Sequence, residues 1–342
     1  MKKILFLVSV SLFISCASNK DTSNDPNIDY ADKFAKTITA KDLAKHLFIY
    51  ASDEFEGRDT GEPGQKKAVN YLKKFYVDHK INSPLGGDDY FQDISSEYLS
   101  TTNRRKLKLK ASENVVAFIK GSEKPNEIVI ISAHLDHVGM KNGEIYNGAD
   151  DDGSGTVSVL EIAETFKKAV DAGKRPKRSI LFLHVTGEEK GLLGSSYYTE
   201  HPIFPLANTV VDLNIDMIGR VDDRHKNNPN YIYLIGADKL STDLYNLSEA
   251  TNKKYTNLSL DYKYNDENDP NRFYYRSDHY NFAKHNIPII FYFNGTHEDY
   301  HKPTDTPDKI NYELLEKRAR LVFYTAWEIA NRKNRLVVDK AK

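Results

Sequence analysis

The sequence contains a single cysteine, Cys16, among 342 residues. One cysteine cannot form a disulfide within the chain, so the folded chain must hold together without one. An excess of one charge is also lacking, because 48 basic and 49 acidic residues leave a formal net charge of -1 and no block of like charge stands out. This balance argues against binding to nucleic acid or to a strongly acidic partner.

A membrane-spanning apolar run is missing near the N-terminus, where the apolar stretch covers only residues 4–14. Two lysines precede it, and Phe-Ile-Ser-Cys, which is typical of a bacterial lipoprotein cleavage site, follows it. We therefore expect residues 1–16 to be a lipoprotein signal peptide that ends at the lipidated Cys16. The alternative is a secretory signal with an incidental cysteine. Residues 17–28 should form a flexible tether, and the lipid should anchor the chain to a bacterial membrane, on the periplasmic or cell-surface face.

Residues 29–342 have the length and the pattern of one α/β domain. From residue 114 onward, apolar strands alternate with amphipathic helices, which favours a mixed, mostly parallel sheet with helices on both faces. The expected strands are residues 114–119, 128–132, 179–185, 209–215, 231–235 and 288–293. The expected helices are residues 153–172, 191–199, 240–251 and 312–332. The predicted fold class is therefore α/β, a three-layer α/β/α sandwich.

The chain before residue 114 is predicted to contain two helices and one strand, at residues 40–52, 63–79 and 90–94. A glycine-punctuated loop between the two helices carries Arg58. A guanidinium in that loop either reaches the functional site or braces the loop, and we favour the bracing role. Residues 81–113 are otherwise a polar connection that is too short to be an inserted domain.

Acidic and imidazole side chains follow several of the predicted strands. His134 and Asp136 come directly after strand 128–132, and residues two apart in an extended chain point to the same side. The other such residues are Asp150, Asp151, Asp152, Glu188, Glu189, Asp216 and His301. In open α/β sheets, ligands bind beyond the carboxyl ends of the strands, which is where these residues lie. Histidine nitrogens and carboxylate oxygens together suit zinc or a similar divalent ion.

Each of these segments alone has an ordinary structural explanation. A His-x-Asp pair is commonly part of a surface turn, and acids before a helix commonly cap its N-terminus. A strand-end aspartate is commonly a solvated turn residue. Their shared position at the strand ends makes a metal site the better explanation of the whole set.

The segment from His297 to His301 fits the HExxH motif of a different, helical class of zinc protease. That motif requires a long helix, so that both histidines share one face. Gly295 and Pro303 flank the segment, and apolar helical periodicity is missing around it. We therefore expect that this segment is not a zinc-binding helix.

The order of the motifs resembles that of the zinc exopeptidases of metallopeptidase family twenty-eight, which includes bacterial leucyl aminopeptidases. Glutamate carboxypeptidase II and the glutaminyl cyclases are relatives. The motifs are His-x-Asp, Gly-Ala-Asp-Asp-x-x-Ser-Gly, Gly-Glu-Glu-x-Gly-Leu-x-Gly-Ser, Asp-Met, Ser-Asp-His and Tyr-His-x-x-x-Asp-Thr. The resemblance covers about residues 47–327, and it implies the zinc-exopeptidase type of α/β/α sandwich.

Position by position, the resemblance implies a centre of two Zn²⁺ ions. His134 and Asp216 would be terminal ligands of one ion, and Glu189 and His301 would be terminal ligands of the other. Asp151 would bridge the two ions, which a carboxylate with two oxygens can do.

The resemblance also implies catalytic roles for three residues. Glu188 would be the general base that passes its proton to the leaving amine. Asp136 would form a hydrogen bond with His134 and fix its tautomer. Tyr300 would donate a hydrogen bond to the tetrahedral intermediate.

Two further acids near these motifs have open roles. Asp278 either helps to hold the substrate amine or caps a helix. Asp305 either orients His301 or caps a turn.

Four residues are expected to be structural rather than ligands. Asp150 and Asp152 flank the predicted bridging residue, and both should cap the following helix. His137 and His285 are expected to be surface or packing residues.

The expected activity is that of a zinc aminopeptidase that removes N-terminal residues from peptides. A glutaminyl cyclase, with the same fold and one zinc ion, is the first alternative. A two-zinc carboxypeptidase or dipeptidase is the second, and it would need a basic cluster for the substrate carboxylate, for which Arg276 is an isolated candidate. A non-catalytic binding lipoprotein is the third, and loss of Glu188 or of the bridging aspartate would have favoured it. Neither residue is lost.

Overall fold

The computed structural model describes residues 28–341. The predicted signal peptide, Cys16 as the lipidated residue, and the predicted tether apart from its last residue lie outside the described residues. Among the residues that are described, none of the helices has both the length and the apolar character required to cross a membrane.

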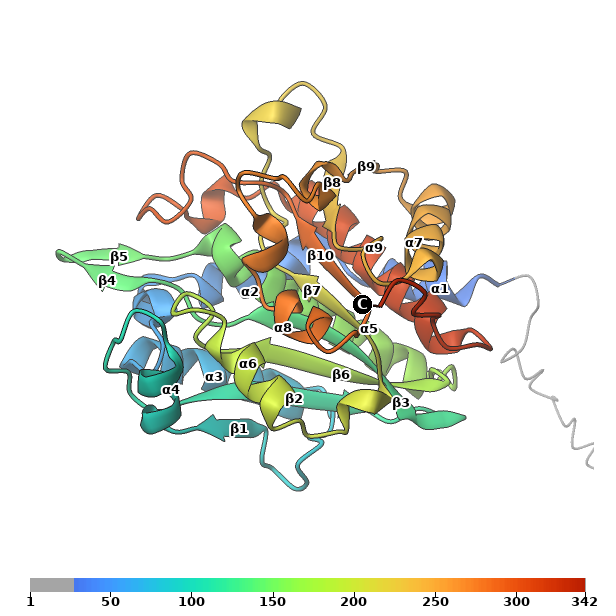
Figure 1. Cartoon of the computed structure of the whole chain (residues 1–342), viewed down its shortest axis with the longest axis horizontal. Coiled ribbons are helices and arrows are strands. Elements are labelled where there is room, and N and C mark those ends of the chain that lie inside the picture. The colour runs from blue at the N-terminus through green and yellow to red at the C-terminus, as the bar shows by residue number, and fades with distance from the viewer. Residues whose placement is uncertain (1–27, 342) are drawn as a thin grey trace, which may run out of the picture.

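A central mixed sheet organises the described part of the chain (Figure 1). Its strands are β1 (Phe91–Ile94), β2 (Ser112–Ile119), β3 (Lys124–His134), β6 (Arg178–Val185), β7 (Thr209–Ile215), β8 (Tyr231–Ile235), β9 (Ser259–Asp261) and β10 (Ile289–Phe293). Within residues 28–341 they form one eight-stranded sheet in the order β1-β2-β6-β3-β7-β10-β8-β9. The pairs β1–β2, β2–β6 and β10–β8 are antiparallel, and all other pairs are parallel. The predicted mixed, mostly parallel sheet is confirmed.

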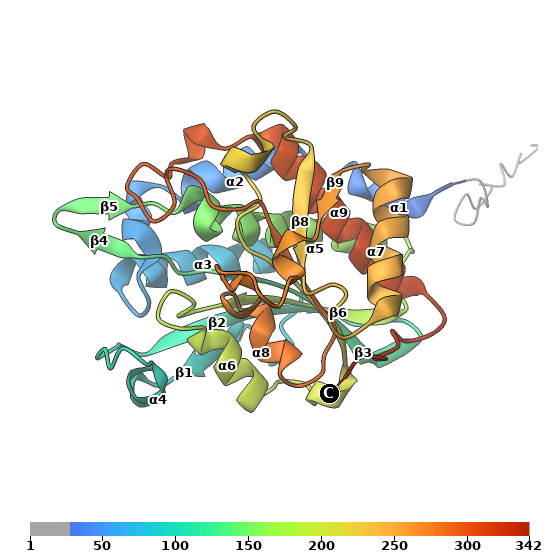
Figure 2. The same cartoon turned by 45° about the horizontal axis from the view of Figure 1, so that its top comes forward.

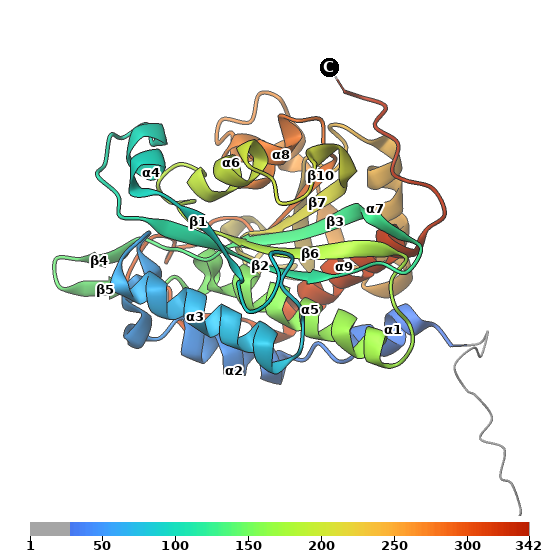
Figure 3. The ribbon, with the colours of Figure 1, turned by 90° about the horizontal axis from the view of Figure 1, so that it is seen from below.

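Helices cover both faces of this sheet (Figures 2 and 3). On one face lie α1 (Tyr30–Ala35), α2 (Ala40–Tyr50), α3 (Pro63–Asp78), α5 (Gly155–Asp171) and α9 (Tyr312–Asn331), with α7 (Thr242–Tyr255) packed beside α9. On the other face lie α4 (Ser96–Thr102), α6 (Leu193–Glu200) and α8 (His279–Ala283). The three-layer α/β/α sandwich is therefore confirmed.

The apolar run of β3 shows why consecutive residues at the centre of such a strand are all apolar. Val129 and Ile131 belong to the larger core beneath α5 and α9, whereas Ile128 and Ile130 belong to the smaller core beneath α6 and α8. Successive side chains of a strand point to opposite faces, and here both faces are covered by helices. Every position of the strand centre must therefore be apolar.

The structure differs from the sequence-based expectations mainly in short elements. The helix expected at residues 153–172 is preceded by an irregular turn, η3 (Ala149–Ser154), in which Asp151 and Asp152 have non-helical backbone angles. The unpredicted elements are α1, α4, α8, β9 and the hairpin of β4 (Gly139–Lys141) and β5 (Glu144–Tyr146). Each is between three and seven residues long, which is too short to show a clear hydrophobic period.

Candidate metal centre and active site

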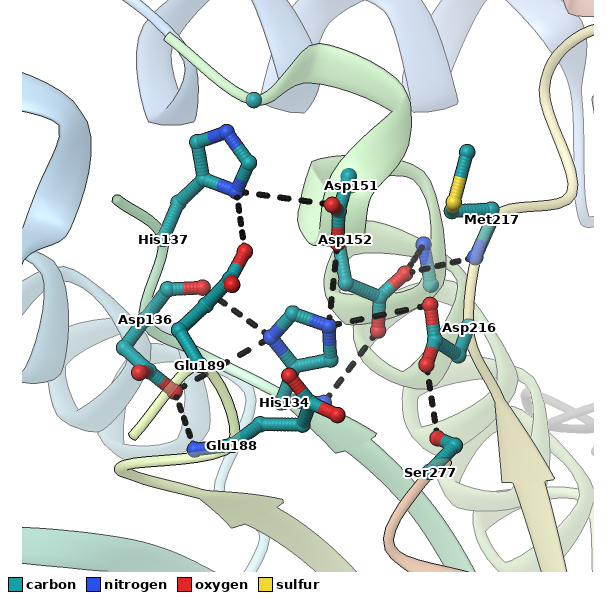
Figure 4. Close-up of polar contacts among 12 residues, drawn as sticks. His134, Asp136, His137, Asp151, Asp152, Glu188, Glu189, Asp216, Met217 and Ser277 are labelled. Atoms are coloured by element: carbon teal, nitrogen blue, oxygen red, sulfur yellow. Dashed lines mark hydrogen bonds and ion pairs between the residues drawn. The ribbon is translucent and has the colours of Figure 1, made fainter. Parts of the chain in front are cut away.

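The carboxyl ends of neighbouring parallel strands bring the predicted site residues together (Figure 4). β3 ends at His134, β6 is followed by Glu188 and Glu189, and β7 is followed by Asp216. Asp151 comes from η3, which leads into α5. Ligands of open α/β sheets bind at this edge, where the loops that follow neighbouring strands lie next to one another.

The first group of donor atoms consists of His134, Asp151 and Asp216. His134 Nε2 lies 3.2 Å from Asp151 Oδ1 and 3.6 Å from Asp216 Oδ1. His134 Nδ1 donates a hydrogen bond of 3.0 Å to the backbone carbonyl of Asp136, so in the neutral ring Nε2 carries no proton. Ser277 Oγ donates to Asp216 Oδ2 at 2.6 Å and holds that carboxylate in place. The lone pair of Nε2 therefore points toward two carboxylates.

The second group consists of His137, Asp151 and Glu189, with His301 at its open side. His137 Nδ1 lies 3.0 Å from Glu189 Oε1 and 3.7 Å from Asp151 Oδ2. His301 Nε2 lies 2.9 Å from Asp151 Oδ2 and 3.0 Å from Glu189 Oε1. Asp151 therefore directs one oxygen to each group, which is the arrangement of a bridging ligand.

These donor atoms fit a divalent metal such as zinc. Among the described residues, His134 Nε2, His137 Nδ1 and Glu189 Oε1 are buried and have no hydrogen-bond partner. Buried polar atoms normally have one, so three such atoms side by side indicate a ligand. Burial alone would lower the pKa of His301, but the carboxylates of Asp151 and Glu189 raise it to about 10. Imidazole nitrogens among carboxylate oxygens are the donors that zinc accepts.

Glu188 lies on the wall of a cavity that Asp151 and Asp216 also line. Its backbone N–H donates to Asp136 Oδ1 at 3.1 Å. Burial raises the pKa of Glu188 well above its usual value; His134 opposes this shift, and the carboxylate of Glu189 adds to it. A buried carboxylate with a shifted pKa in such a cavity is a candidate functional residue.

The carboxylate of Asp136 does not act as the sequence analysis expected. Its Oδ1 lies 3.9 Å from His134 Nδ1, and the backbone carbonyl of Asp136 accepts the hydrogen bond instead. Because the chain turns directly after β3, the peptide group comes opposite the ring and the side chain points onward. The carboxylate accepts hydrogen bonds from the N–H of Glu188 and from Thr60 Oγ1, at 3.1 Å and 2.8 Å. Asp136 thus positions the loop of the candidate base as well as the histidine.

Asp152 is a structural residue, as expected. Its Oδ1 accepts hydrogen bonds from the N–H groups of Gly155, at the start of α5, and Met217, at 2.9 Å and 3.1 Å. Its Oδ2 accepts from the N–H of His134 at 3.2 Å. One carboxylate therefore caps the helix and ties together the ends of β3 and β7.

Asp150 and Asp305 have roles that were not predicted. Asp150 does not cap α5: its Oδ1 accepts from the N–H of Gly219 at 2.7 Å, because the backbone of η3 directs the side chain toward the loop after β7. Asp305 neither orients His301 nor caps a turn. Its carboxylate accepts from the N–H groups of Asp150 and Asp151, at 3.0 Å and 3.2 Å. A distant loop therefore braces the backbone of Asp151, the residue that both donor groups share.

The HExxH segment is not a helix, which confirms the prediction against that motif. His297 lies in an irregular segment after β10, and residues 298–301 form turns. His297 Nε2 contacts Asp150 Oδ2 at 3.2 Å, whereas His301 reaches Asp151 and Glu189. The two histidines serve different partners.

Two cavities open onto the donor groups. The smaller has a volume of about 30 Å³ and is lined by Asp151, Glu188, Asp216, Met217, Phe273, Arg276, Phe291, Phe293, Thr296 and Tyr300. The larger, of about 690 Å³, is lined in part by Glu188, Glu189, Tyr300 and His301. Four apolar side chains of the smaller cavity thus lie beside carboxylates of the candidate centre.

Tyr300 lies on the wall of both cavities. Its hydroxyl is 3.5 Å from Arg276 Nη2. Burial and the nearby carboxylates, first Asp151 and then Glu188, raise the pKa of this hydroxyl well above its usual value. The hydroxyl therefore keeps its proton and can donate a hydrogen bond into the cavity.

Asp278 occupies the N-cap position of α8, which is one of its two expected roles. It lines neither cavity, and it precedes α8 without a capping hydrogen bond from its side chain. Ser195 donates to one of its oxygens, and burial raises the pKa of its carboxyl to about 7. Its fully buried carboxyl therefore links the start of α8 to α6.

Three further expectations have clear outcomes. Arg58 braces its loop, because the buried guanidinium donates to the carbonyls of Leu135, Tyr50, Asn147 and Gly148. His285 is exposed, as expected. His137, expected at the surface or in packing, is fully buried and lies in the second donor group. A histidine three residues after the first ligand carries no periodicity that would have revealed this.

The sequence matches known proteins over much of its length. Residues 114–326, more than half of the chain, match the model of "Peptidase family M28". Aminopeptidase YwaD of Bacillus subtilis (strain 168) is 27% identical over 272 residues, which are 75% of this chain and 54% of that protein. "Probable glutamate carboxypeptidase AMP1" of Arabidopsis thaliana is 35% identical over 119 residues, 34% of this chain and 16% of that protein. The chain spans about half, or less, of the length of these curated relatives.

Solved structures share the fold. An aminopeptidase from Aneurinibacillus sp. strain AM-1 is 17% identical with a TM-score of 0.65, over 91% of this chain and 98% of that chain. BSAP, a zinc aminopeptidase from Bacillus subtilis, is 18% identical with a TM-score of 0.65, over 89% and 97%. At these identities the likeness shows the α/β/α fold alone. Together with the family match over most of the sheet, it shows that the chain belongs to peptidase family M28.

Proposed function

We propose that this protein is a zinc-dependent aminopeptidase that hydrolyses the N-terminal residue from peptides and uses two Zn²⁺ ions. The observation that carries the proposal is the pair of donor groups that share Asp151, one oxygen in each. A one-zinc glutaminyl cyclase needs only one such group. YwaD and BSAP, which this chain resembles, are described as aminopeptidases, and BSAP as a zinc enzyme.

In this proposal the donor groups divide the ligands as the family resemblance implies. His134 and Asp216 would hold one ion, Glu189 and His301 would hold the other, and Asp151 would supply one oxygen to each. When bound, such ions lower the pKa of water and polarise a carbonyl group. The hydrogen bonds from Ser277 to Asp216 and from His134 to the carbonyl of Asp136 keep these donors oriented before any ion arrives.

Glu188 carries the proton transfers. Its carboxylate accepts a proton from the attacking water as oxygen adds to the scissile carbonyl carbon. The same carboxyl then gives that proton to the amine nitrogen as the C–N bond breaks, so the base is restored. Tyr300, whose hydroxyl stays protonated, donates a hydrogen bond to the carbonyl oxygen as negative charge develops on it.

The smaller cavity supports a preference for apolar N-terminal residues. Met217, Phe273, Phe291 and Phe293 line it beside the carboxylates. Burial of an apolar side chain against these groups is favourable by about 25 cal/mol per Å² of buried surface. A charged side chain would lose its hydration there, although Arg276 at the wall can accept an acidic one.

A second candidate function is a zinc dipeptidase or carboxypeptidase, and the larger cavity favours it. Its lining includes Arg104, Arg105, Arg272, Arg276 and Lys284. In the described part of the chain none of these five groups forms an ion pair with a carboxylate. Arg276 is therefore not isolated, contrary to the sequence analysis, because the fold brings segments before β2 and around α8 to one cavity. Guanidinium groups bind a free substrate carboxylate well.

One substrate panel separates these functions. It contains leucyl-anilide, dileucine, dileucine amide, an N-acetylated peptide and a glutaminyl peptide, each tested with zinc, after chelation and with Glu188→Gln. An aminopeptidase cleaves the anilide and both dileucine substrates, and Glu188→Gln lowers kcat by about 10²–10⁴-fold with the zinc content unchanged. Cleavage of dileucine but not of its amide would support the dipeptidase, and cleavage of only the N-acetylated peptide the carboxypeptidase. Cyclisation of the glutaminyl peptide alone would support the cyclase.

We also propose that the chain is exported and anchored to a bacterial membrane through lipid on Cys16. The lysines, the short apolar run and the Phe-Ile-Ser-Cys sequence support this proposal. The test is incorporation of radiolabelled palmitate by the expressing bacterium. Wild-type protein should carry the label in the membrane fraction and Cys16→Ser should not, and equal labelling of both would contradict the proposal.

A further inference from the structure

We infer that His137 is a further protein ligand of the second metal ion, which makes the two metal positions unequal. The inference rests on the proposed two-zinc function, but it concerns a residue outside the ligand set that the family resemblance implies. His137 is fully buried, and its Nδ1 belongs to a compact group with Asp151 and Glu189 (Figure 4).

The contact between His137 and Glu189 has the distance of a hydrogen bond but not its geometry. Nδ1 lies 3.0 Å from Glu189 Oε1, yet neither atom has a hydrogen-bond partner among the described residues. A hydrogen bond requires the N–H to point along the line between the two atoms. His134 Nε2, the expected ligand of the first ion, shows the same combination of burial, short distances to carboxylates and no hydrogen bond. Both nitrogens therefore point at a position between the carboxylates.

The surrounding backbone is built to admit this ring. Gly148 has a left-handed φ of 53°, and a Cβ there would lie 2.5 Å from Cγ and Cδ2 of His137. Arg58 Nη2 donates to the carbonyl of Gly148 at 2.9 Å, and the N–H of His137 donates to the carbonyl of Arg58 at 3.3 Å. The same Cβ would lie 2.2 Å from the backbone oxygen of Asp151, so any other residue at position 148 would clash with both the imidazole and the backbone of Asp151. Arg58 thus holds both sides of the cradle, with its buried guanidinium at Gly148 and its backbone carbonyl at His137.

The consequence is a difference in the number of protein donors. The second ion would be held by His137, Asp151, Glu189 and His301, whereas the first would be held by His134, Asp151 and Asp216 alone. Zinc sites with four protein ligands are typically closed and retain their ion, and sites with three keep an open position. We therefore assign the tightly held ion to the second group and the exchangeable ion to the first.

Two measurements on the zinc-loaded protein test the inference. X-ray absorption at the zinc edge should count three imidazoles per two zinc ions in the wild type and two in His137→Ala. In dialysis against increasing chelator, the wild type should pass through a state with one zinc ion. His137→Ala should bind the second ion at least about 10-fold more weakly and lose that state. Added imidazole should restore retention in His137→Ala, and the exposed His285→Ala should behave as the wild type.

Two results would contradict a role of His137 as a zinc ligand. Two imidazoles in the wild type, or unchanged zinc retention in His137→Ala, would overturn the inference and leave His137 as a packing residue beside Glu189. Should His137→Ala fail to fold, the imidazole count of the wild type decides alone. A wild type that binds two zinc ions and cleaves peptides keeps the proposed function even when the inference fails. A wild type that binds no zinc removes both.

Discussion

The two donor groups that share Asp151 are held in different ways. In the first group, His134 ends a central strand with a side chain that is 1% exposed, and Asp216 is fixed by Ser277. In the second group, His301 lies in a turn with a left-handed φ of 55°, and its side chain is 38% exposed. The first group is thus rigid but has few donors, whereas the second has more donors but is completed by a loop. Rigidity and donor number are separate ways to hold a metal ion.

The largest expected effect comes from the residue common to both groups. Asp151→Ala removes the oxygens that serve the two groups, so both ions should be lost and kcat/KM should fall by more than about 10⁴-fold. Metal analysis of the purified variant and peptide hydrolysis check this. The adjacent Asp150→Asn is the control, since Asp150 bonds Gly219 and His297 rather than the donor groups, and it should keep most of its zinc. Retention of two zinc ions by Asp151→Ala would contradict the shared bridge.

A smaller and more selective effect is expected at the support of the first group. Ser277→Ala removes the hydroxyl that holds Asp216, which should weaken binding of the first ion by about 10–100-fold and leave the second ion unchanged. Zinc titration with a competing chelator measures both constants. Ser195→Ala is the matched control, because Ser195 donates to Asp278 in the same layer but to no donor of either group. Equal weakening of both ions would show that the groups are not independent.

The smallest effect concerns a buried acid that belongs to neither group and serves as a reference for both. Glu161 on α5 lies 3.4 Å from His46 Nε2. Burial first, and then the charge of Glu164, raises the pKa of Glu161 to about 8 from an ordinary value of 4.5. Burial lowers the pKa of His46 to about 4, so near pH 7 both groups are largely uncharged.

The sign of the resulting pH dependence follows from these values. Between pH 4.5 and about 8 the unfolded chain has released the proton of Glu161 while the folded chain keeps it, so stability falls as pH rises through this window. Glu161→Gln should remove that fall and be more stable than the wild type at pH 8 by on the order of 1–3 kcal/mol, with no gain below pH 4.5. Chemical unfolding at both pH values measures this, with the exposed Glu267→Gln as control. An equal difference between wild type and variant at the two pH values would refute the assignment.

The predictable part of the site follows from its nearness to recognisable strands. His134, Glu189 and Asp216 each lie within a few residues of an apolar run, and such runs are visible in the sequence. His301 lies eight residues after β10, farther from its strand than the other three. The residues whose contacts were not predicted, Asp150 and Asp305 among them, lie in loops, and no local sequence pattern indicates the direction of a loop side chain.

The basic wall of the larger cavity could not be predicted at all. Arg104 lies between α4 and β2, Arg276 lies just before α8, and Lys284 follows α8. Segments that are more than 150 residues apart in the sequence line the same cavity only because β1, β2 and α4 fold back beside α6 and α8 (Figure 1). The spacing of residues within one segment does not indicate which distant segments will lie beside it.

The sequence by itself determined the α/β class, the positions of the main strands along the chain and most of the candidate site residues that follow those strands. These are local properties, since hydrophobic period and adjacent motifs are read within one segment. Only the tertiary structure decided which atom of each residue points at the metal position and which points away. That choice depends on loop backbones held by distant partners, as Asp305 holds η3 and Arg58 holds Gly148, and no residue can specify it without them.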